Sequence, residues 1–283
     1  MQFLLNAAAS SALVSLIGFA IWIVYRSRGY YDFGLLLALV GSPFLVLAVV
    51  RAGGSSFLGI LVALAVCAMI GATTTFILPA APQDRKPLLV RLTVGSYGLW
   101  LAGQGLLFAV FGDQPLSFPQ LANAPFFNIR QSSISSGELM QLAMALLMWL
   151  ILASLSRRST YWIAWKATAT NNWSALYYGI PAQRIIACGA GAAYVCAAVA
   201  GITQAVSIDV TPYPAFSLFL NGAVVALIAE GLSLFKLFFA SVAIGSAVTL
   251  AIITVGAVWQ EVFSALALFA ALAWLTFVSR KIR

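Results

Sequence analysis

Few side chains in this sequence could take part in chemistry, and their scarcity is informative. Histidine, the commonest general base and metal ligand, is absent. The three cysteines, Cys67, Cys188 and Cys196, lie within apolar stretches, which predicts small packing residues and no disulfide framework. The phosphate-binding pattern GxxxxGK(S/T) does not occur. We therefore expect a protein that is not an enzyme, with no metal site and no cofactor of its own.

One acidic residue has an unusual setting. Glu230 is the only acid that lies well inside an apolar segment. A carboxylate in hydrocarbon is costly and usually faces a cavity or a partner, so Glu230 is a candidate functional residue. The simpler alternative is an ion pair with Lys236, or contact with water at the end of the segment.

The longest polar interruption of the chain is basic and aromatic. The segment Ser156–Arg184 contains four basic residues and no acid. Its pattern predicts a helix over Thr160–Thr170, a break at Asn171–Asn172, and a second short helix over Trp173–Tyr178. Gly179, followed closely by a proline, predicts the end of that second helix.

The three tryptophans of this segment, Trp162, Trp165 and Trp173, give it a bulky apolar side. Two interpretations fit them. The segment could be an amphipathic helix that lies on the membrane surface. It could instead be a projecting helix pair that docks in a groove of a cytoplasmic partner, with apolar anchors buried and basic residues at the rim.

The elements that must position these residues follow from composition. Hydrophobic residues make up 63% of the 283, charged residues 8%, and the mean hydropathy is +1.01, whereas soluble domains carry about 25% charge. This predicts an all-α, polytopic membrane protein with a single domain over residues 1–283.

About nine stretches, within a range of about eight to ten, are long enough to span a bilayer. They are Phe3–Tyr25, Leu35–Val50, Leu58–Leu78, Pro87–Gly112, Gly137–Leu155, Ile185–Val206, Ser217–Phe235, Leu237–Trp259 and Val262–Ser279. The seventh and eighth are separated only by Lys236, which fits either a tight hairpin or broken half-helices.

Basic residues predict the orientation. With the N-terminus outside, 13 of the 15 lysines and arginines fall in cytoplasmic segments, and only Arg51 and Arg130 fall outside. Positive charge is enriched on the cytoplasmic side of membrane proteins. We therefore expect a cytoplasmic C-terminus, an external loop over residues 113–136, and a cytoplasmic loop over residues 156–184.

The segment that starts at Arg157 resembles the coupling loop of permease subunits in the branched-chain amino-acid type of ABC importer. It aligns without a gap to the family pattern RRTRLGRAMRAVAQDPEAARLLGIDVDR. Asn171 replaces an acid of that pattern. The positions that match in type or identity, or lie beside a match, are Arg157, Arg158, Thr160, Ala164, Lys166, Ala167, Ala169, Ala175, Gly179, Ile180 and Arg184.

The similarity extends over nearly the whole chain. The stretch LLNAAASSALVSLIGFAIWIVYRSRGYYDFG is similar to the family's opening, with Asn6, Tyr25 and Phe33 in place. Asp32 stands where the family has an asparagine. In the segment Leu227–Lys236, Ala229 and Glu230 replace two family glycines, so this part departs most from the pattern.

The resemblance implies a multi-pass permease subunit of the bacterial inner membrane. Its partners would be a second permease subunit, identical or related, two cytoplasmic ATPases that bind ATP and Mg, and an external solute-binding protein. The 156–184 loop would contact the ATPase through Arg157, Arg158, Thr160, Lys166, Ala167, Ala169, Asn171, Gly179 and Arg184. The translocation pathway would include Asn6, Tyr30, Tyr31, Asp32, Phe33, Gly34, Gln104 and Glu230.

The predicted pathway residues could instead have purely structural roles. Tyrosines at a membrane boundary often anchor the chain at the interface, and amides within spans often only bond neighbouring helices. The solute would be a branched-chain or other amino acid, with sugars, nucleosides or urea as alternatives within the superfamily. An ion-coupled secondary transporter would need several intramembrane acids, and only Glu230 fits that requirement.

Overall fold

The computed structural model describes residues 2–78, 86–117, 127–129, 132–207, 210–212, 216–229, 233–256 and 259–281, and the statements below concern these residues. The fold is helical, as the sequence predicts. The helices are α1 (Gln2–Arg28), α2 (Gly34–Arg51), α3 (Ser56–Ile77), α4 (Lys86–Phe111), α5 (Ser136–Arg158), α6 (Thr160–Thr170), α7 (Asn172–Tyr177), α8 (Ala182–Ser207), α9 (Phe216–Ile228), α10 (Leu234–Val255) and α11 (Gln260–Lys281).

Each of the nine predicted spans overlaps mainly with one helix, and in the described part seven helices are long and apolar enough to cross a membrane. The prediction for the seventh span is wrong at its end. The helix predicted over Ser217–Phe235 stops at Ile228, and Phe235 belongs to α10. At 1.5 Å per residue, the 13 residues of α9 reach only about 20 Å, short of a hydrocarbon core of about 30 Å. Glu230 lies outside the described residues.

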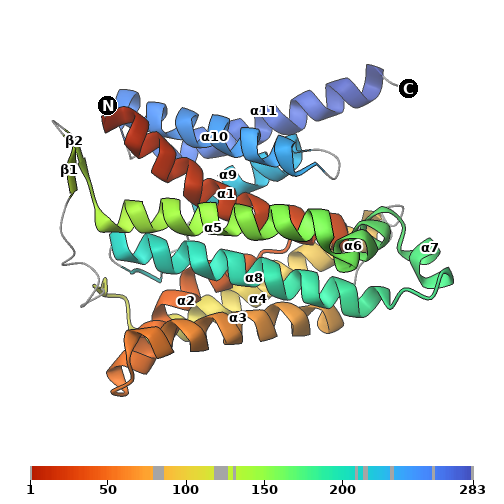
Figure 1. The fold of residues 1–283 in the computed structure, drawn as a ribbon, viewed down its shortest axis with the longest axis horizontal. Helices are drawn as coiled ribbons and strands as arrows, with labels where there is room; N and C mark the ends of the chain where they lie inside the picture. Colours follow the sequence, from red (N-terminus) through yellow and green to blue (C-terminus); the bar gives the residue numbers. More distant parts are fainter. Residues whose placement is uncertain are drawn as a thin grey trace.

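Helix α1 lies at the centre of the bundle. It packs against α5, α6, α8, α9 and α10, and nearly all of its second half is buried. Glycines allow the closest approaches: a Cβ atom at Gly245 of α10 would collide with Ser11, and one at Gly222 of α9 would lie 2.5 Å from Ile17. Figure 1 shows α1 running between α10 and α5, with α2, α3 and α4 on the far side of α8.

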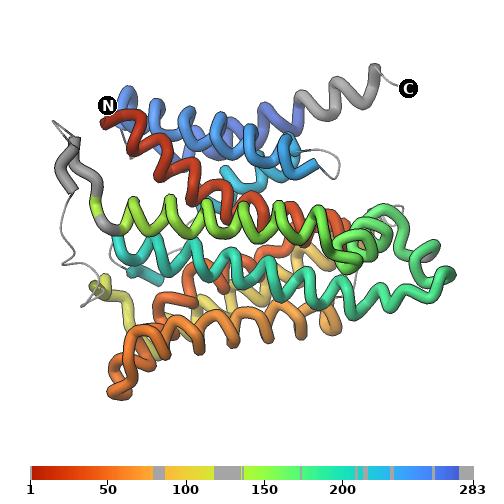
Figure 2. The backbone as a smooth tube through the Cα atoms, in the orientation of Figure 1, coloured from red at the N-terminus to blue at the C-terminus, as the bar shows by residue number. Residues whose placement is uncertain are grey.

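The segment between α5 and α8 folds as the sequence predicts, with α6 ending at Thr170 and α7 beginning at Asn172. Side-chain caps explain where α6 and α7 begin. Ser159 Oγ accepts a hydrogen bond from the Tyr161 N–H at 3.2 Å, and Asn171 Oδ1 accepts one from Ser174 at 3.1 Å. After α7, Gly179 adopts φ +76°, which favours glycine and turns the chain towards α8. Figures 1 and 2 show α7 projecting beyond one end of the bundle.

The opposite end of the bundle carries the predicted external loop, which is described only in part. It departs from the all-α expectation by one antiparallel pair of three-residue strands, β1 (Phe127–Ile129) and β2 (Ser132–Ile134). Ser135 and Glu138 then form a capping box that starts α5. Leu116 and Val210 exchange backbone hydrogen bonds of 2.9 and 2.8 Å, which ties this loop to the end of α8.

Candidate functional site

The tip of the α6–α7 segment is apolar and open. Leu176 is 51% exposed, Tyr177 89% and Tyr178 80%. The two tyrosine rings contact each other edge to face at 5.9 Å. Gly179 and Asn171, which end and begin this turn, are exposed as well. Large apolar side chains this exposed on a projecting helix are typical of a protein-binding surface.

Basic side chains lie on the helices that flank this tip in sequence. Arg157 and Arg158 are exposed in the last turn of α5, and Arg184 is exposed in the first turn of α8. Lys166 is half-buried and places its Nζ 5.9 Å from the centre of the Trp162 ring. Of the remaining residues predicted to contact a partner, Thr160 is exposed, whereas Ala167 and Ala169 are half-buried. An acidic partner surface would complement these positive charges.

The tryptophans of α6 face neither lipid nor a partner, so the expectation that they form its outer anchor surface is wrong. Trp162 and Trp165 are 7% and 3% exposed, and both pack on Trp22 of α1. Burial of these rings attaches α6 to the bundle, because large aromatic side chains contribute most to such contacts. The open apolar residues lie instead on α7. The side chain of Trp173 lies outside the described residues.

Tyr161 adds a second attachment of α6. Its hydroxyl donates a hydrogen bond to the Ile185 carbonyl of α8 at 3.2 Å. Burial, with a smaller contribution from a hydrogen bond with Cys188, raises the pKa of Tyr161 above the usual tyrosine range. The hydroxyl therefore stays protonated at physiological pH and remains a donor.

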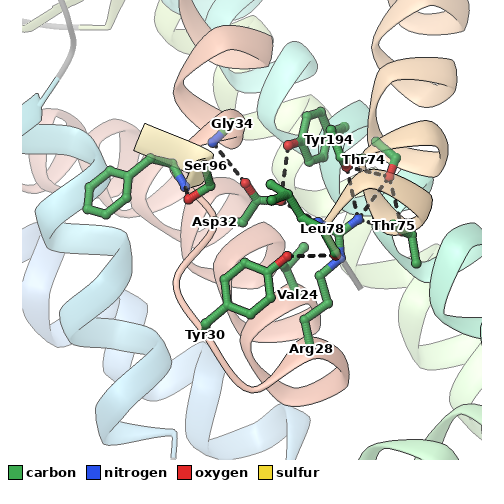
Figure 3. Close-up of polar contacts among 12 residues, drawn as sticks. Val24, Arg28, Tyr30, Asp32, Gly34, Thr74, Thr75, Leu78, Ser96 and Tyr194 are labelled. Atoms are coloured by element: carbon green, nitrogen blue, oxygen red, sulfur yellow. Dashed lines mark hydrogen bonds and ion pairs between the residues drawn. The ribbon is translucent and has the colours of Figure 1, made fainter. Parts of the chain in front are cut away.

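Figure 3 shows a second cluster, around the linker between α1 and α2. Arg28, the last residue of α1, pairs with Asp32 at 2.6 Å, and neither side chain has any exposed surface. Its other amino group donates to the Gly71 carbonyl at 3.0 Å, to Thr74 at 2.9 Å and to Thr75. A buried guanidinium requires such a set of acceptors, since it is costly when unpaired.

Asp32 joins this cluster to two further helices. Its Oδ2 accepts a hydrogen bond from the Tyr194 hydroxyl of α8 at 3.0 Å, and its Oδ1 accepts one from the Gly34 N–H at 2.9 Å. The second bond satisfies an orphan donor at the start of α2. A Cβ atom at Gly34 would collide with the Tyr194 hydroxyl, so this approach requires glycine. The cluster therefore fixes the linker against α3 and α8.

The other linker residues have separate contacts. Tyr30 is buried and donates to the Leu78 carbonyl at 2.9 Å. Tyr31 stacks on Tyr25 at 4.8 Å between ring centres. Phe33 is half-buried, and its ring stacks on Phe219 of α9 at 5.1 Å.

The remaining predicted pathway residues do not join this cluster. Asn6 lies 22 residues before Arg28 on α1, which is about 33 Å along the helix. It is half-buried and accepts a hydrogen bond from Gln2 at 3.0 Å. Gln104 lies near the other end of α4 from the linker and donates to the Pro212 carbonyl at 3.2 Å.

Two features escaped the sequence analysis. The first is the Arg28–Asp32 pair. Arg28 was counted as a cytoplasmic loop charge, yet it is the buried last residue of a helix. The spacing of four residues between an arginine and an acid was an available signal. The second is Trp22, which nothing in the sequence connects to the tryptophans of α6. Within the described residues, no group of three His, Cys, Asp or Glu side chains is placed to hold a metal ion.

Comparison with known proteins identifies the family. The sequence model described as "Branched-chain amino acid transport system / permease component" matches residues 3–272. No curated protein sequence matches the chain. A solved structure described as PsaBC from Streptococcus pneumoniae in complex with Fab has a similar fold, with a TM-score of 0.51 and 14% identity. The match covers 96% of this chain and 91% of the other. The resemblance noted in the sequence is thus confirmed, and the chain belongs to the branched-chain amino acid transport permease family of multi-pass, non-catalytic ABC transporter subunits.

Proposed function

We propose that this chain is the permease subunit of an ATP-driven importer in the bacterial inner membrane. Its substrates are small polar solutes, and the family points to branched-chain or other amino acids. It assembles with a second permease subunit, two cytoplasmic ATPases that bind ATP and Mg, and an external solute-binding protein. About nine segments of the chain lie in the membrane, with the N-terminus outside and the C-terminus in the cytoplasm.

The distribution of charge supports this orientation. The end of the molecule that carries α6 and α7 also holds Arg26 of α1, Arg157 and Arg158 of α5, and Arg184 of α8. α11 runs towards the same end in Figure 1. Positive charge collects on the cytoplasmic side. The α6–α7 segment therefore faces the cytosol, where ATPases are found.

One observation carries the proposal: the α6–α7 segment is fixed to the bundle on one side and open on the other. The inward side holds Trp162 and Trp165, and the outward tip presents Tyr177 and Tyr178. A membrane-surface helix would instead direct its tryptophans into lipid. This geometry suits a helix pair that enters a groove of a partner and moves with it.

Transport itself would occur by alternating access around a central pathway. Closure of the ATPases on ATP displaces α6 and α7, and the helices attached to them rotate. Of the predicted pathway residues in the linker, Tyr31 and Phe33 keep partly exposed side chains. Asp32 and Gly34 are fully enclosed, so we assign them to positioning the linker and not to contact with solute. Asn6, Gln104 and Glu230 remain predicted pathway residues.

The direct test is co-purification of the ATPase with the double variant Tyr177→Ser/Tyr178→Ser. Truncating aromatic residues that are binding hot spots costs about 2 kcal/mol or more, so we expect the bound ATPase to fall at least about tenfold. Phe57→Ser is the matched control, because Phe57 is 71% exposed at the opposite end of the bundle. Full retention of the ATPase by the double variant would show that α7 is not the docking surface.

A further inference from the structure

Three tryptophans from two distant parts of the sequence form one buried cluster. Trp22 comes from the C-terminal third of α1, and Trp162 and Trp165 come from α6. The ring centres lie 5.3 Å apart for Trp22 and Trp165, 6.3 Å for Trp22 and Trp162, and 5.0 Å for the two α6 rings. Each ring is at least nine-tenths buried. This cluster, here called the tryptophan cluster, is the main apolar contact between α6 and α1.

The tryptophan cluster reaches the helix on which the rest of the bundle packs. α1 contacts α5, α8, α9 and α10 as well as α6, and it approaches α9 and α10 closely at Gly222 and Gly245. Six residues beyond Trp22, the same helix ends at Arg28, whose guanidinium binds α3. A displacement of α6 would therefore be passed through Trp22 along α1 to the linker and to α3.

Trp165 also faces α8. A Cβ atom at Gly189 would lie 3.2 Å from Trp165 Nε1, so glycine leaves room for the indole there. Trp165 is thus wedged between α1 and α8, two helices that carry different parts of the bundle. α1 packs on α9 and α10, whereas α8 packs on α2 and α3. A movement of Trp165 at this point can change the angle between α1, with α9 and α10, and α8, with α2 and α3.

The cluster relies on ring packing for its stability. Within the described part of the chain, the buried indole N–H groups of Trp162 and Trp165 have no hydrogen-bond partner. Leaving a buried donor unpaired is unfavourable, and such groups in native structures call for an explanation. The contact of Trp162 and Trp165 with Trp22 is therefore made by their rings.

We propose that Trp22, Trp162 and Trp165 are positioning residues that transmit the movement of the α6–α7 segment to α1. The proposal rests on the proposed function, because the ATPase supplies the movement. It goes further by assigning the transmission to a ring cluster inside the membrane domain and not to the docking surface. Loss of the cluster therefore uncouples α1 from the ATPase without releasing the ATPase.

The test is hydrogen–deuterium exchange of the assembled complex in nanodiscs, with and without ATP and vanadate. In the wild type, trapping should change exchange in α6–α7 and also in the α1–α2 linker, residues 29–33. In Trp22→Leu, the α6–α7 response should persist, whereas the linker response should fall at least about fivefold, the lower range for coupled sites. Phe44→Leu is the matched control, because Phe44 is fully buried on α2, eleven residues beyond the linker, and its ring packs on Phe111 of α4.

Two further variants keep the test decisive if Trp22→Leu folds poorly. Trp22→Phe should preserve most of the linker response, because it keeps a ring. Gly189→Ala retains all three indoles but crowds Trp165, and it should reduce the linker response with the ATPase still bound. A normal linker response in Trp22→Leu or in Gly189→Ala would overturn the proposal. So would a wild-type linker that does not respond to trapping.

The two proposals fail in different ways. If α6–α7 of the wild type does not respond to ATP and vanadate, or if Tyr177→Ser/Tyr178→Ser still holds the ATPase, the docking assignment fails. If docking holds but the linker of Trp22→Leu responds normally, only the transmission through the tryptophan cluster fails.

Discussion

The Arg28–Asp32 pair allows the sharpest quantitative prediction. Asp32→Asn keeps the size of the side chain but removes the charge that faces Arg28 at 2.6 Å. Both side chains are fully buried, so the guanidinium would be left without a counter-charge. Breaking a buried ion pair by removing one partner costs about 3–5 kcal/mol. We expect the free energy of unfolding of Asp32→Asn to fall by about that amount.

The double variant separates the cost of an orphaned charge from loss of the pair itself. In Arg28→Met/Asp32→Asn no charge is left behind. Thr74 and Thr75 keep hydrogen bonds to the Gly71 carbonyl, so removal of the arginine orphans neither hydroxyl. Replacing a buried pair by uncharged groups of similar volume is often close to neutral. We therefore expect the double variant to recover at least about 2 kcal/mol of the loss, as a non-additive term between contacting residues.

The assay is equilibrium unfolding in mixed micelles of detergent and SDS, followed by tryptophan fluorescence for the wild type, both single variants and the double variant. The four free energies form a double-mutant cycle. If Asp32→Asn loses less than about 1 kcal/mol, or if the two single losses simply add, Arg28 and Asp32 do not compensate each other and the description of the cluster is wrong.

Three smaller predictions concern the backbone and the helix caps. Gly34→Ala should lower the free energy of unfolding by about 1–3 kcal/mol, because its Cβ atom meets Tyr194. In the same assay Gly98→Ala should be neutral or slightly stabilising, because no other atom lies near its Cβ position. Ser135→Ala removes the capping box of α5 and should cost about 1 kcal/mol of unfolding free energy, with Ser135→Asn restoring it. Asn171→Ala removes the cap of α7. Proteolysis near the tip should then become several-fold faster, while the global free energy of unfolding stays unchanged. An unchanged proteolysis rate would argue against a stable α7.

The helices were predictable because each is specified by local sequence. Long apolar runs fix the spans, and Ser159, Asn171 and Gly179 mark the α6–α7 pair through their own side chains or backbone. The end of α9 was missed because averaged hydropathy hides Glu230 and Gly231, which interrupt the apolar run directly after Ala229. Hydropathy measures the average hydrophobicity of a segment and does not show where its backbone turns.

The site was predictable only in part, because its contacts are long-range. Trp22 and Trp165 are 143 positions apart in sequence, and no periodicity relates them. The pairing of Arg28 with Asp32 is local, but its burial depends on acceptors for Arg28 from α3 and on a donor to Asp32 from α8. The exposed tip of α7 was predicted as part of a docking segment, yet the division into an inward tryptophan side and an outward tyrosine tip required the fold.

The most direct measurement of the central claim is the side of the membrane on which the tip of α7 lies, and what covers it. In a Cys188→Ser background, which removes the exposed native thiol, Tyr178→Cys can be labelled with an impermeant maleimide. The account predicts no labelling in intact cells, labelling in inverted membranes, and protection there when the ATPase is bound. Phe57→Cys, at the opposite end, should show the reverse sidedness. Labelling of Tyr178→Cys from outside the cell, or labelling in inverted membranes that the ATPase leaves unchanged, would contradict the account.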